Sequence, residues 1–133
     1  MIPPLEIQMR FADIDKMGHV NNAVYLNYFE AARMHFLVHL LGESWDWNKE
    51  GIILLKNEVE YLKPVLLEHK PVVNVGVEKI GNKSFALNYR LEVEGVTYCT
   101  GVSLLVAYNY MEQKAQSIPG VMREKLQTFK EEQ

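Results

Sequence analysis

The chain of 133 residues is 48% hydrophobic and 23% charged, which predicts one globular domain with a sizeable core. No segment approaches the roughly 18 uninterrupted apolar residues of a membrane span, so we expect no membrane partner. The formal net charge of -3 lacks the basic excess that contact with a phosphate backbone needs, which excludes nucleic acid as a partner.

The first elements in chain order are a short strand and a loop. Residues Leu5–Phe11 alternate well enough between apolar and polar side chains to predict the strand. Residues Ala12–Asn22 are rich in Asp, Gly and Asn, a composition that is typical of turns. We therefore expect the chain to enter the domain along one edge and then to form a polar loop.

One long helix follows this loop. From Ala23 to Leu41, apolar residues recur at helical spacing around most of the circumference, which predicts a helix that is buried on several sides. Asn21 or Asn22 can cap its N-terminus, and Gly42 is placed to end it.

The second half of the chain predicts a sheet and a last helix. The alternation is strongest in one strand, where the odd-numbered residues from Phe85 to Val93 are all apolar and the intervening residues are mostly polar. Consecutive strands that are joined by short turns predict an antiparallel sheet, and the long helix has only that sheet to pack against. The predicted strands are Ile52–Leu62, Val72–Ile80, Phe85–Glu94 and Val96–Tyr108, and the predicted helix is Pro119–Lys130.

The cysteine count and the N-terminus indicate the compartment. Cys99 is the only cysteine, which excludes an intrachain disulfide and a cysteine-based zinc site. It lies in a predicted strand, where a packed thiol is expected rather than a nucleophile. Pro3 and Pro4 follow Met1 with no basic segment leading into an apolar run, so we expect no secretory signal and a cytoplasmic, soluble protein.

The loop before the long helix concentrates the ionisable residues. The first turn of a helix leaves amide N–H groups without intrahelical partners, and these groups would stabilise a carbonyl oxygen that gains negative charge during acyl transfer. Asp13 or Asp15 could attack such a carbonyl carbon directly or take a proton from an attacking water. Their spacing alone does not separate the two.

Three segments together resemble a known family. Asp13 to Leu26, Tyr28 to Arg33 and Glu60 to Pro64 are similar to the hotdog-fold acyl-CoA thioesterases of the 4-hydroxybenzoyl-CoA thioesterase-like group. The run His-Val-Asn-Asn at residues 19–22 also resembles the acyl-carrier-protein thioesterases of plants and bacteria. The resemblance implies a single α+β hotdog domain over residues 1–133, in which a five-stranded antiparallel sheet wraps around the long central helix and a C-terminal helix follows.

The resemblance also implies roles for individual residues. Asp15 is the catalytic carboxylate, the amide of Asn22 polarises the thioester carbonyl, and His19 assists. Tyr25, on the first turn of the helix, is expected to bind substrate. Met17 stands where the plant variant has an Asn, which argues against an Asp-Asn-His mechanism and leaves Asp15 as the main candidate.

The expected substrate is an acyl thioester of coenzyme A or of acyl carrier protein. Lys79 and Lys83 flank a predicted turn and could contact the phosphates of coenzyme A, with Ser84 near its pantetheine, although lysines at a hairpin end are usually only solvated. No metal or redox cofactor is required. The resemblance implies a homodimer or homotetramer whose active site lies at the dimer interface.

Two other hypotheses assign a different function to the chain. A binding module would hold acyl-CoA or acyl carrier protein without hydrolysing it, and a hydratase would add water to an enoyl thioester. Calcium binding is rejected, because Met17 offers no oxygen at the third ligand position and Val24 stands where a bidentate Glu is needed. No Gly-x-Ser-x-Gly occurs, so a serine hydrolase mechanism has no support.

Overall fold

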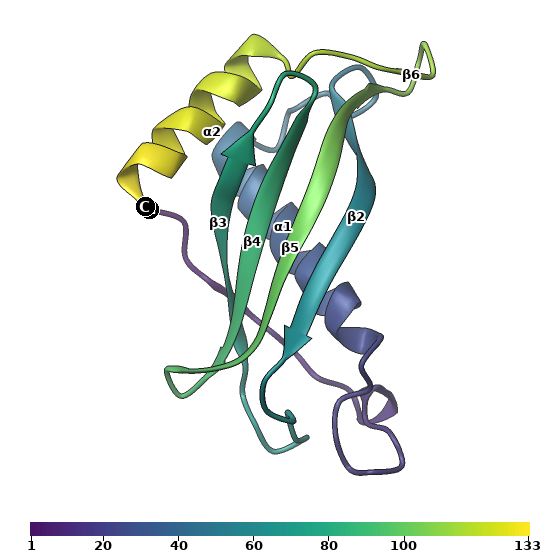
Figure 1. Ribbon diagram of the computed structural model, residues 1–133, viewed down its shortest axis with the longest axis vertical. Coiled ribbons are helices and arrows are strands. Elements are labelled where there is room, and N and C mark those ends of the chain that lie inside the picture. Colours follow the sequence, from purple (N-terminus) through teal and green to yellow (C-terminus); the bar gives the residue numbers. More distant parts are fainter.

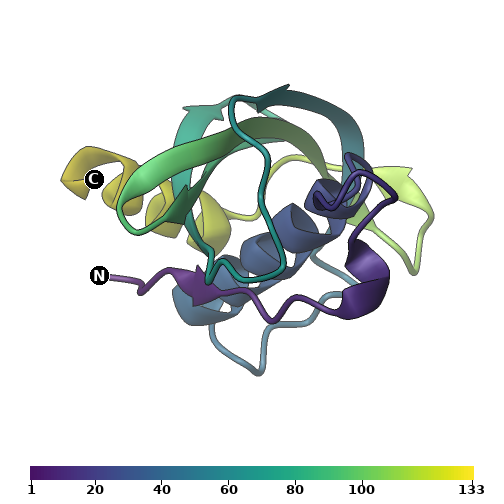
Figure 2. The same cartoon turned by 90° about the horizontal axis from the view of Figure 1, so that it is seen from below.

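Helix α1, Val24–Leu41, runs along the concave side of one curled sheet (Figures 1 and 2). The computed structural model describes residues 1–133. The helix begins within one residue of its predicted start and ends at Gly42, whose φ of 95° suits glycine. The expectation of an Asn N-cap is wrong. Ala23 takes that position, and the Asn21 side chain instead accepts a hydrogen bond from the Ala23 N–H at 2.9 Å, within the turn before the helix.

The sheet is antiparallel throughout and has the order β1-β3-β4-β5-β2. The five predicted strands are all present, and a short strand that pairs with β5 was not predicted. Strand β2 forms an edge along its whole length. The strands are β1 (Leu5–Glu6), β2 (Gly51–Tyr61), β3 (Val72–Ile80), β4 (Ser84–Val93), β5 (Val96–Asn109) and β6 (Lys114–Ala115).

Strand β1 is much shorter than predicted, because a 3-10 helix, Phe11–Asp13, occupies the end of the predicted segment. The Asp13 carboxylate accepts a hydrogen bond from the Arg10 N–H at 3.1 Å and forms an ion pair with its guanidinium at 3.1 Å. These contacts hold the chain in a tight turn. An alternation of apolar and polar residues does not predict this turn, because the turn depends on the contacts of Arg10 with Asp13.

The core lies between α1 and the concave face of the sheet. The five apolar residues that alternate from Phe85 to Val93 are all buried, as their pattern predicts. At Gly101 of β5, an added Cβ would lie 2.8 Å from the Phe29 ring, so the absence of a side chain lets α1 pack closely against the strand. Cys99 is buried too, and burial raises the pKa of its thiol to about 12, as expected for a packed rather than a reactive cysteine.

Helix α2, Gly120–Glu132, closes one side of the sheet. Met122 and Leu126 are buried, and Phe129 packs edge-on against Phe36 of α1 with ring centroids 4.8 Å apart. The Arg123 side chain donates hydrogen bonds of 2.8 Å to two carbonyls of the β3–β4 turn. Neither helix is long and apolar enough to cross a membrane.

Candidate active site

A pocket of about 270 Å³ lies where the polar loop, the start of α1 and the end of β2 meet. Four of the residues singled out in the sequence, Asp15, His19, Asn22 and Tyr25, line this pocket together. The other lining residues are Val20, Tyr61, Leu62, Lys63 and Pro64.

Asp13 lies outside the pocket and is 2% exposed. Its carboxylate accepts hydrogen bonds from Tyr28 Oη at 2.7 Å and from the backbone and side chain of Arg10. Burial alone would raise the pKa of Asp13, but the Tyr28 and Arg10 contacts outweigh burial and hold the pKa below its usual value. Asp13 is therefore a charged anchor of the loop.

Asp15 is half-buried and lines the pocket. Its Oδ1 accepts hydrogen bonds from the backbone N–H of Met17 at 2.9 Å and of His19 at 3.4 Å, while its Oδ2 bonds to no group of the chain. The carboxylate is thus held in place by one oxygen, and the other oxygen is available to a ligand. The structure separates the two aspartates, which their spacing did not.

The loop around Asp15 is tied to itself and to the segment after β2. The Asp15 N–H donates to His19 O at 2.8 Å, and Gly18, with a φ of 82°, donates to Asp15 O at 3.0 Å. The Val20 N–H donates to Val65 O at 2.9 Å, and His19 pairs with Leu66 as an isolated bridge. These contacts place Asp15 and His19 against the 62–66 segment.

Asn22 stands just before α1 and lines the pocket. The N–H groups of its neighbours are engaged, that of Asn21 with Asp13 O and that of Ala23 with the Asn21 side chain, whereas the Asn22 N–H donates to no group of the chain. The Asn22 carbonyl accepts a hydrogen bond from Tyr61 Oη at 2.8 Å. A free amide N–H at a helix start is suited to an oxygen that gains negative charge.

Tyr25 forms a wall of the pocket and is 2% exposed. Its hydroxyl accepts a hydrogen bond from the Val65 N–H at 3.3 Å, and its ring packs edge-on against Tyr61 with centroids 5.1 Å apart. Burial raises the pKa of Tyr25, so its phenol is protonated at neutral pH.

Tyr61 and Lys63 are pocket residues that the sequence reasoning missed as functional candidates. Both belong to the Glu60 to Pro64 segment, which contributed to the family resemblance without a role assigned to either side chain. The Lys63 ammonium lies 5.6 Å from the centroid of the Tyr98 ring. The sequence indicated that the Glu60 to Pro64 segment belongs to the family pattern. Only the fold shows that this segment lies beside the loop that contains Asp15.

Lys79, Lys83 and Ser84 do not join the pocket within one chain. They lie at the β3–β4 turn, at the opposite end of the long axis from the loop of residues 11–22 (Figure 1). Both lysines are exposed, and Ser84 is half-buried, with its backbone carbonyl accepting a hydrogen bond from Gly81 at 2.7 Å. Their contact with coenzyme A stays a prediction.

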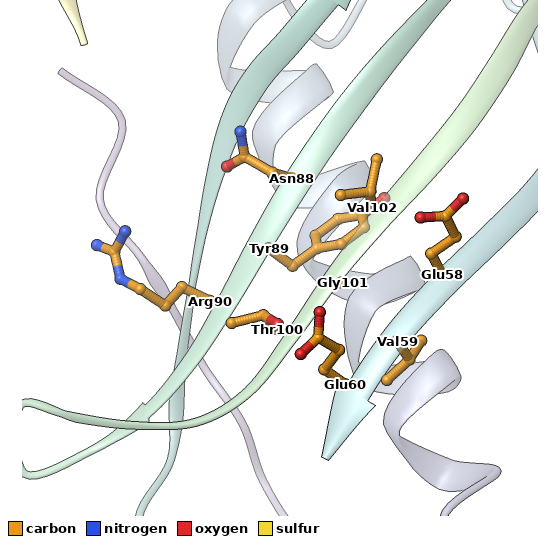
Figure 3. Close-up of a pocket in the computed structure, with 9 residues that line it drawn as sticks. All are labelled: Glu58, Val59, Glu60, Asn88, Tyr89, Arg90, Thr100, Gly101 and Val102. Atoms are coloured by element: carbon orange, nitrogen blue, oxygen red, sulfur yellow. The ribbon is translucent and has the colours of Figure 1, made fainter. Parts of the chain in front are cut away.

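A second hollow of about 340 Å³ lies where the end of β2 stands beside β5 and the middle of β4 (Figure 3). Glu58 and Glu60 stand on one side of it and Asn88 and Arg90 on the other, with Thr100 between them. Glu58 forms an ion pair with Lys56 at 2.7 Å, and Arg90 forms one with Glu92 at 3.1 Å. The charges of Glu58 and Arg90 are therefore each balanced by a neighbour on the same strand. None of the sequence-predicted site residues lies there.

A long helix wrapped by an antiparallel sheet is the hotdog architecture, and the comparisons with known proteins define its class. The model of the thioesterase-like superfamily matches residues 9–126. The chain belongs to this superfamily, and its reaction class is thioester hydrolysis.

Individual relatives agree with this assignment. The chain is 28% identical to the long-chain acyl-CoA thioesterase FadM of Escherichia coli, over 92% of this chain and 95% of that protein. A thioesterase from Thermus thermophilus, solved with coenzyme A and Zn, is 27% identical and superposes with a TM-score of 0.84, over 96% of this chain and 93% of the other. A predicted thioesterase from Bacillus stearothermophilus is 25% identical, with a TM-score of 0.85 over 95% and 94%.

Proposed function

We propose that this protein hydrolyses acyl-CoA thioesters to a free acid and coenzyme A, with the Asp15 carboxylate acting on the thioester carbonyl. The observation that supports the proposal is one pocket lined by both Asp15, whose Oδ2 has no partner in the chain, and Asn22, whose N–H has none. The coenzyme A carrier is favoured because FadM is an acyl-CoA thioesterase and the Thermus thermophilus protein was solved with coenzyme A.

In the general-base route, Asp15 takes a proton from water as the water oxygen attacks the carbonyl carbon. The carbonyl oxygen becomes an oxyanion that accepts a hydrogen bond from the Asn22 N–H. The oxyanion then collapses, the carbon–sulfur bond breaks, and the thiolate of coenzyme A receives the proton held by Asp15, either directly or passed on through His19. Tyr25 forms the wall against which the acyl group lies.

A covalent route uses the same geometry. Asp15 itself attacks the carbonyl carbon, the thiolate leaves, and water then hydrolyses the mixed anhydride. A single turnover in ¹⁸O-labelled water identifies a covalent route when the label enters Asp15. The covalent route, with water attacking the anhydride at the Asp15 carbonyl, would leave label in the Asp15 carboxylate after one turnover, whereas the general-base route places it in the released acid alone.

The experiment that tests the function is a substrate panel of acyl thioesters of increasing length on both carriers, followed by release of free thiol. We expect turnover with acyl-CoA and less with acyl carrier protein. Binding by calorimetry without product would instead assign a binding module, and addition of water to an enoyl-CoA would assign a hydratase.

We also propose that two copies pair along the β2 edge. An edge strand of 11 residues leaves a row of backbone groups unpaired, and apolar side chains such as Leu54 and Met34, 40% and 36% exposed, stand beside it. Antiparallel pairing would bring the β3–β4 turn of one copy to the same end of the dimer as the pocket of the other. Lys79, Lys83 and Ser84 would then serve the partner's coenzyme A. Sedimentation that detects only monomer at micromolar concentration would contradict the pairing.

A further inference from the structure

One hydroxyl of the pocket has no part in the chemistry described so far. Tyr61 is the last residue of β2, and its Oη donates a hydrogen bond of 2.8 Å to the carbonyl oxygen of Asn22. Both residues line the pocket that contains Asp15. This single bond joins the end of the edge strand to the start of α1.

The Asn22 carbonyl has no other hydrogen-bond partner in the chain. In the first turn, the Val24 N–H donates to Asn21 O and the Leu26 N–H to Ala23 O, so the helix itself leaves this carbonyl unbonded. An unbonded carbonyl at the pocket would direct its partial negative charge toward a reaction that develops negative charge on the substrate oxygen. The Tyr61 hydroxyl offsets that charge and fixes the direction of the carbonyl.

The ring of Tyr61 is held as well as its hydroxyl. It packs edge-on against Tyr25, and Tyr25 is itself fixed by burial and by the hydrogen bond from Val65. Although Tyr61 is 45% exposed, its phenol is thus held by contacts at both ends. A side chain held in this way needs little further ordering to keep its hydrogen bond during a reaction.

We propose that Tyr61 is a positioning residue for thioester hydrolysis. Its hydroxyl holds the Asn22 carbonyl, and thereby the peptide planes of this turn, in the orientation that keeps the Asn22 N–H directed at the thioester oxygen. Tyr61 acts through Asn22 and does not touch the reacting atoms. The inference rests on the proposed function of the pocket.

The chain contains a matched control for this bond. The hydroxyl of Tyr110 also donates to a backbone carbonyl, that of Ile52, at the same distance of 2.8 Å. Tyr110 is 48% exposed, close to the 45% of Tyr61, but it does not line the pocket that contains Asp15. Replacing either Tyr by Phe removes the same kind of bond, so the two variants differ mainly in where the bond lies.

The test compares kcat, KM and melting temperature of Tyr61→Phe and Tyr110→Phe on a long-chain acyl-CoA. We expect Tyr61→Phe to lower kcat by about 2- to 10-fold, the net strength of one hydrogen bond, while KM stays unchanged. Tyr110→Phe should change neither constant, and both variants should lower the melting temperature by the same small amount. Because the Tyr110 bond ends on Ile52 of the β2 edge, sedimentation should show the same assembly for both variants and the unaltered protein.

Several results would overturn the assignment. Equal kcat values for the two variants would show that the Tyr61 bond has no part in turnover. A rise in KM at constant kcat would make Tyr61 a substrate contact, and a fall in melting temperature confined to Tyr61→Phe, with kcat per folded molecule unchanged, would make it structural. Failure of the proposed function is recognised separately, because the unaltered protein would then hydrolyse no acyl thioester.

Discussion

Asp13 and Asp15 are two residues apart in one loop, yet their surroundings are opposite. Asp13 is buried and accepts hydrogen bonds on both oxygens from Arg10 and Tyr28. Asp15 uses one oxygen to hold its own loop and presents the other to a pocket. A carboxylate whose acceptor sites are filled stabilises a fold, whereas one with a free oxygen is available for chemistry.

The difference also explains how the loop keeps its shape. The charge of Asp13 is matched by Arg10, and its backbone carbonyl accepts a hydrogen bond from the Asn21 N–H at 2.9 Å, so Asp13 links both ends of the loop. Asp15 lies between these ends. We therefore propose that Asp13 stabilises the loop and that Asp15 serves turnover, and the following variants test that division.

The largest effect is expected for Asp15→Asn. The amide retains an oxygen that can accept the Met17 and His19 hydrogen bonds, but it can neither take a proton from water nor attack a carbonyl. We expect kcat to fall by about 10²- to 10⁴-fold with an unchanged melting temperature. Steady-state kinetics on acyl-CoA beside a thermal melt measure both quantities, and retention of near-normal turnover would contradict the assignment.

The next effect is the loss of stability in Asp13→Ala. This variant removes charge-assisted hydrogen bonds from Arg10 and from the buried Tyr28, which we expect to lower the free energy of unfolding by about 2–4 kcal/mol. Urea denaturation measures this loss. Turnover per folded molecule should fall far less than in Asp15→Asn, and equal loss of turnover in the two variants would contradict the division of roles.

The stabilisation from Asp13 should depend on pH. Because the folded-state pKa of Asp13 is lowered, its contribution is fully present above the unfolded pKa of about 3.9 and is lost as pH falls through the folded value. The difference in unfolding free energy between the unaltered protein and Asp13→Ala should therefore be constant near neutral pH and shrink below about pH 4. A difference that grows with acidification would contradict the direction of the pKa shift.

A smaller effect is expected for Tyr28→Phe. Burial and the hydrogen bond to Asp13 both raise the pKa of Tyr28, so its phenol is protonated and donates at neutral pH. Loss of this donor should cost about 1–2 kcal/mol, less than Asp13→Ala because the Arg10 contacts remain. The same urea titration measures it, and a loss equal to that of Asp13→Ala would show that Arg10 contributes nothing.

The smallest effect is expected for Arg10→Gln. The Arg10 side chain is 76% exposed, and exposed ion pairs contribute about 0–1 kcal/mol. The backbone N–H of residue 10, which also bonds to Asp13, is retained. A measured loss above that range would show that the guanidinium, and not the backbone turn, holds Asp13.

The fold was largely predictable because its elements have local signals. The helical spacing from Ala23 to Leu41 and the alternation from Phe85 to Val93 each follow from burial on a regular surface, and both are confirmed. The N-cap of α1 and the end of β1 were not predicted correctly, because the Asn21 side chain bonds within the turn before α1 and the Arg10–Asp13 contacts form a turn after β1. Contacts between two individual residues produce no periodic pattern of apolar side chains, so the sequence does not predict them.

The site was predictable only in part, and for the same reason. The family resemblance placed Asp15, His19, Asn22 and Tyr25 together, and one pocket contains all four. The role of Tyr61 depends on a bond between residues 39 positions apart, which no spacing in the sequence indicates. Lys79, Lys83 and Ser84 do not line this pocket within one chain, and their contact with coenzyme A stays a prediction.

The most direct measurement is a crystal structure of Asp15→Asn with an unhydrolysed acyl-CoA. We predict that the thioester carbonyl oxygen accepts a hydrogen bond from the Asn22 N–H and that the substituted side chain lies about 3–3.5 Å from the carbonyl carbon or from a water placed to attack it. A thioester bound outside this pocket, for instance at the hollow formed by Glu58, Glu60 and Arg90, would contradict the account.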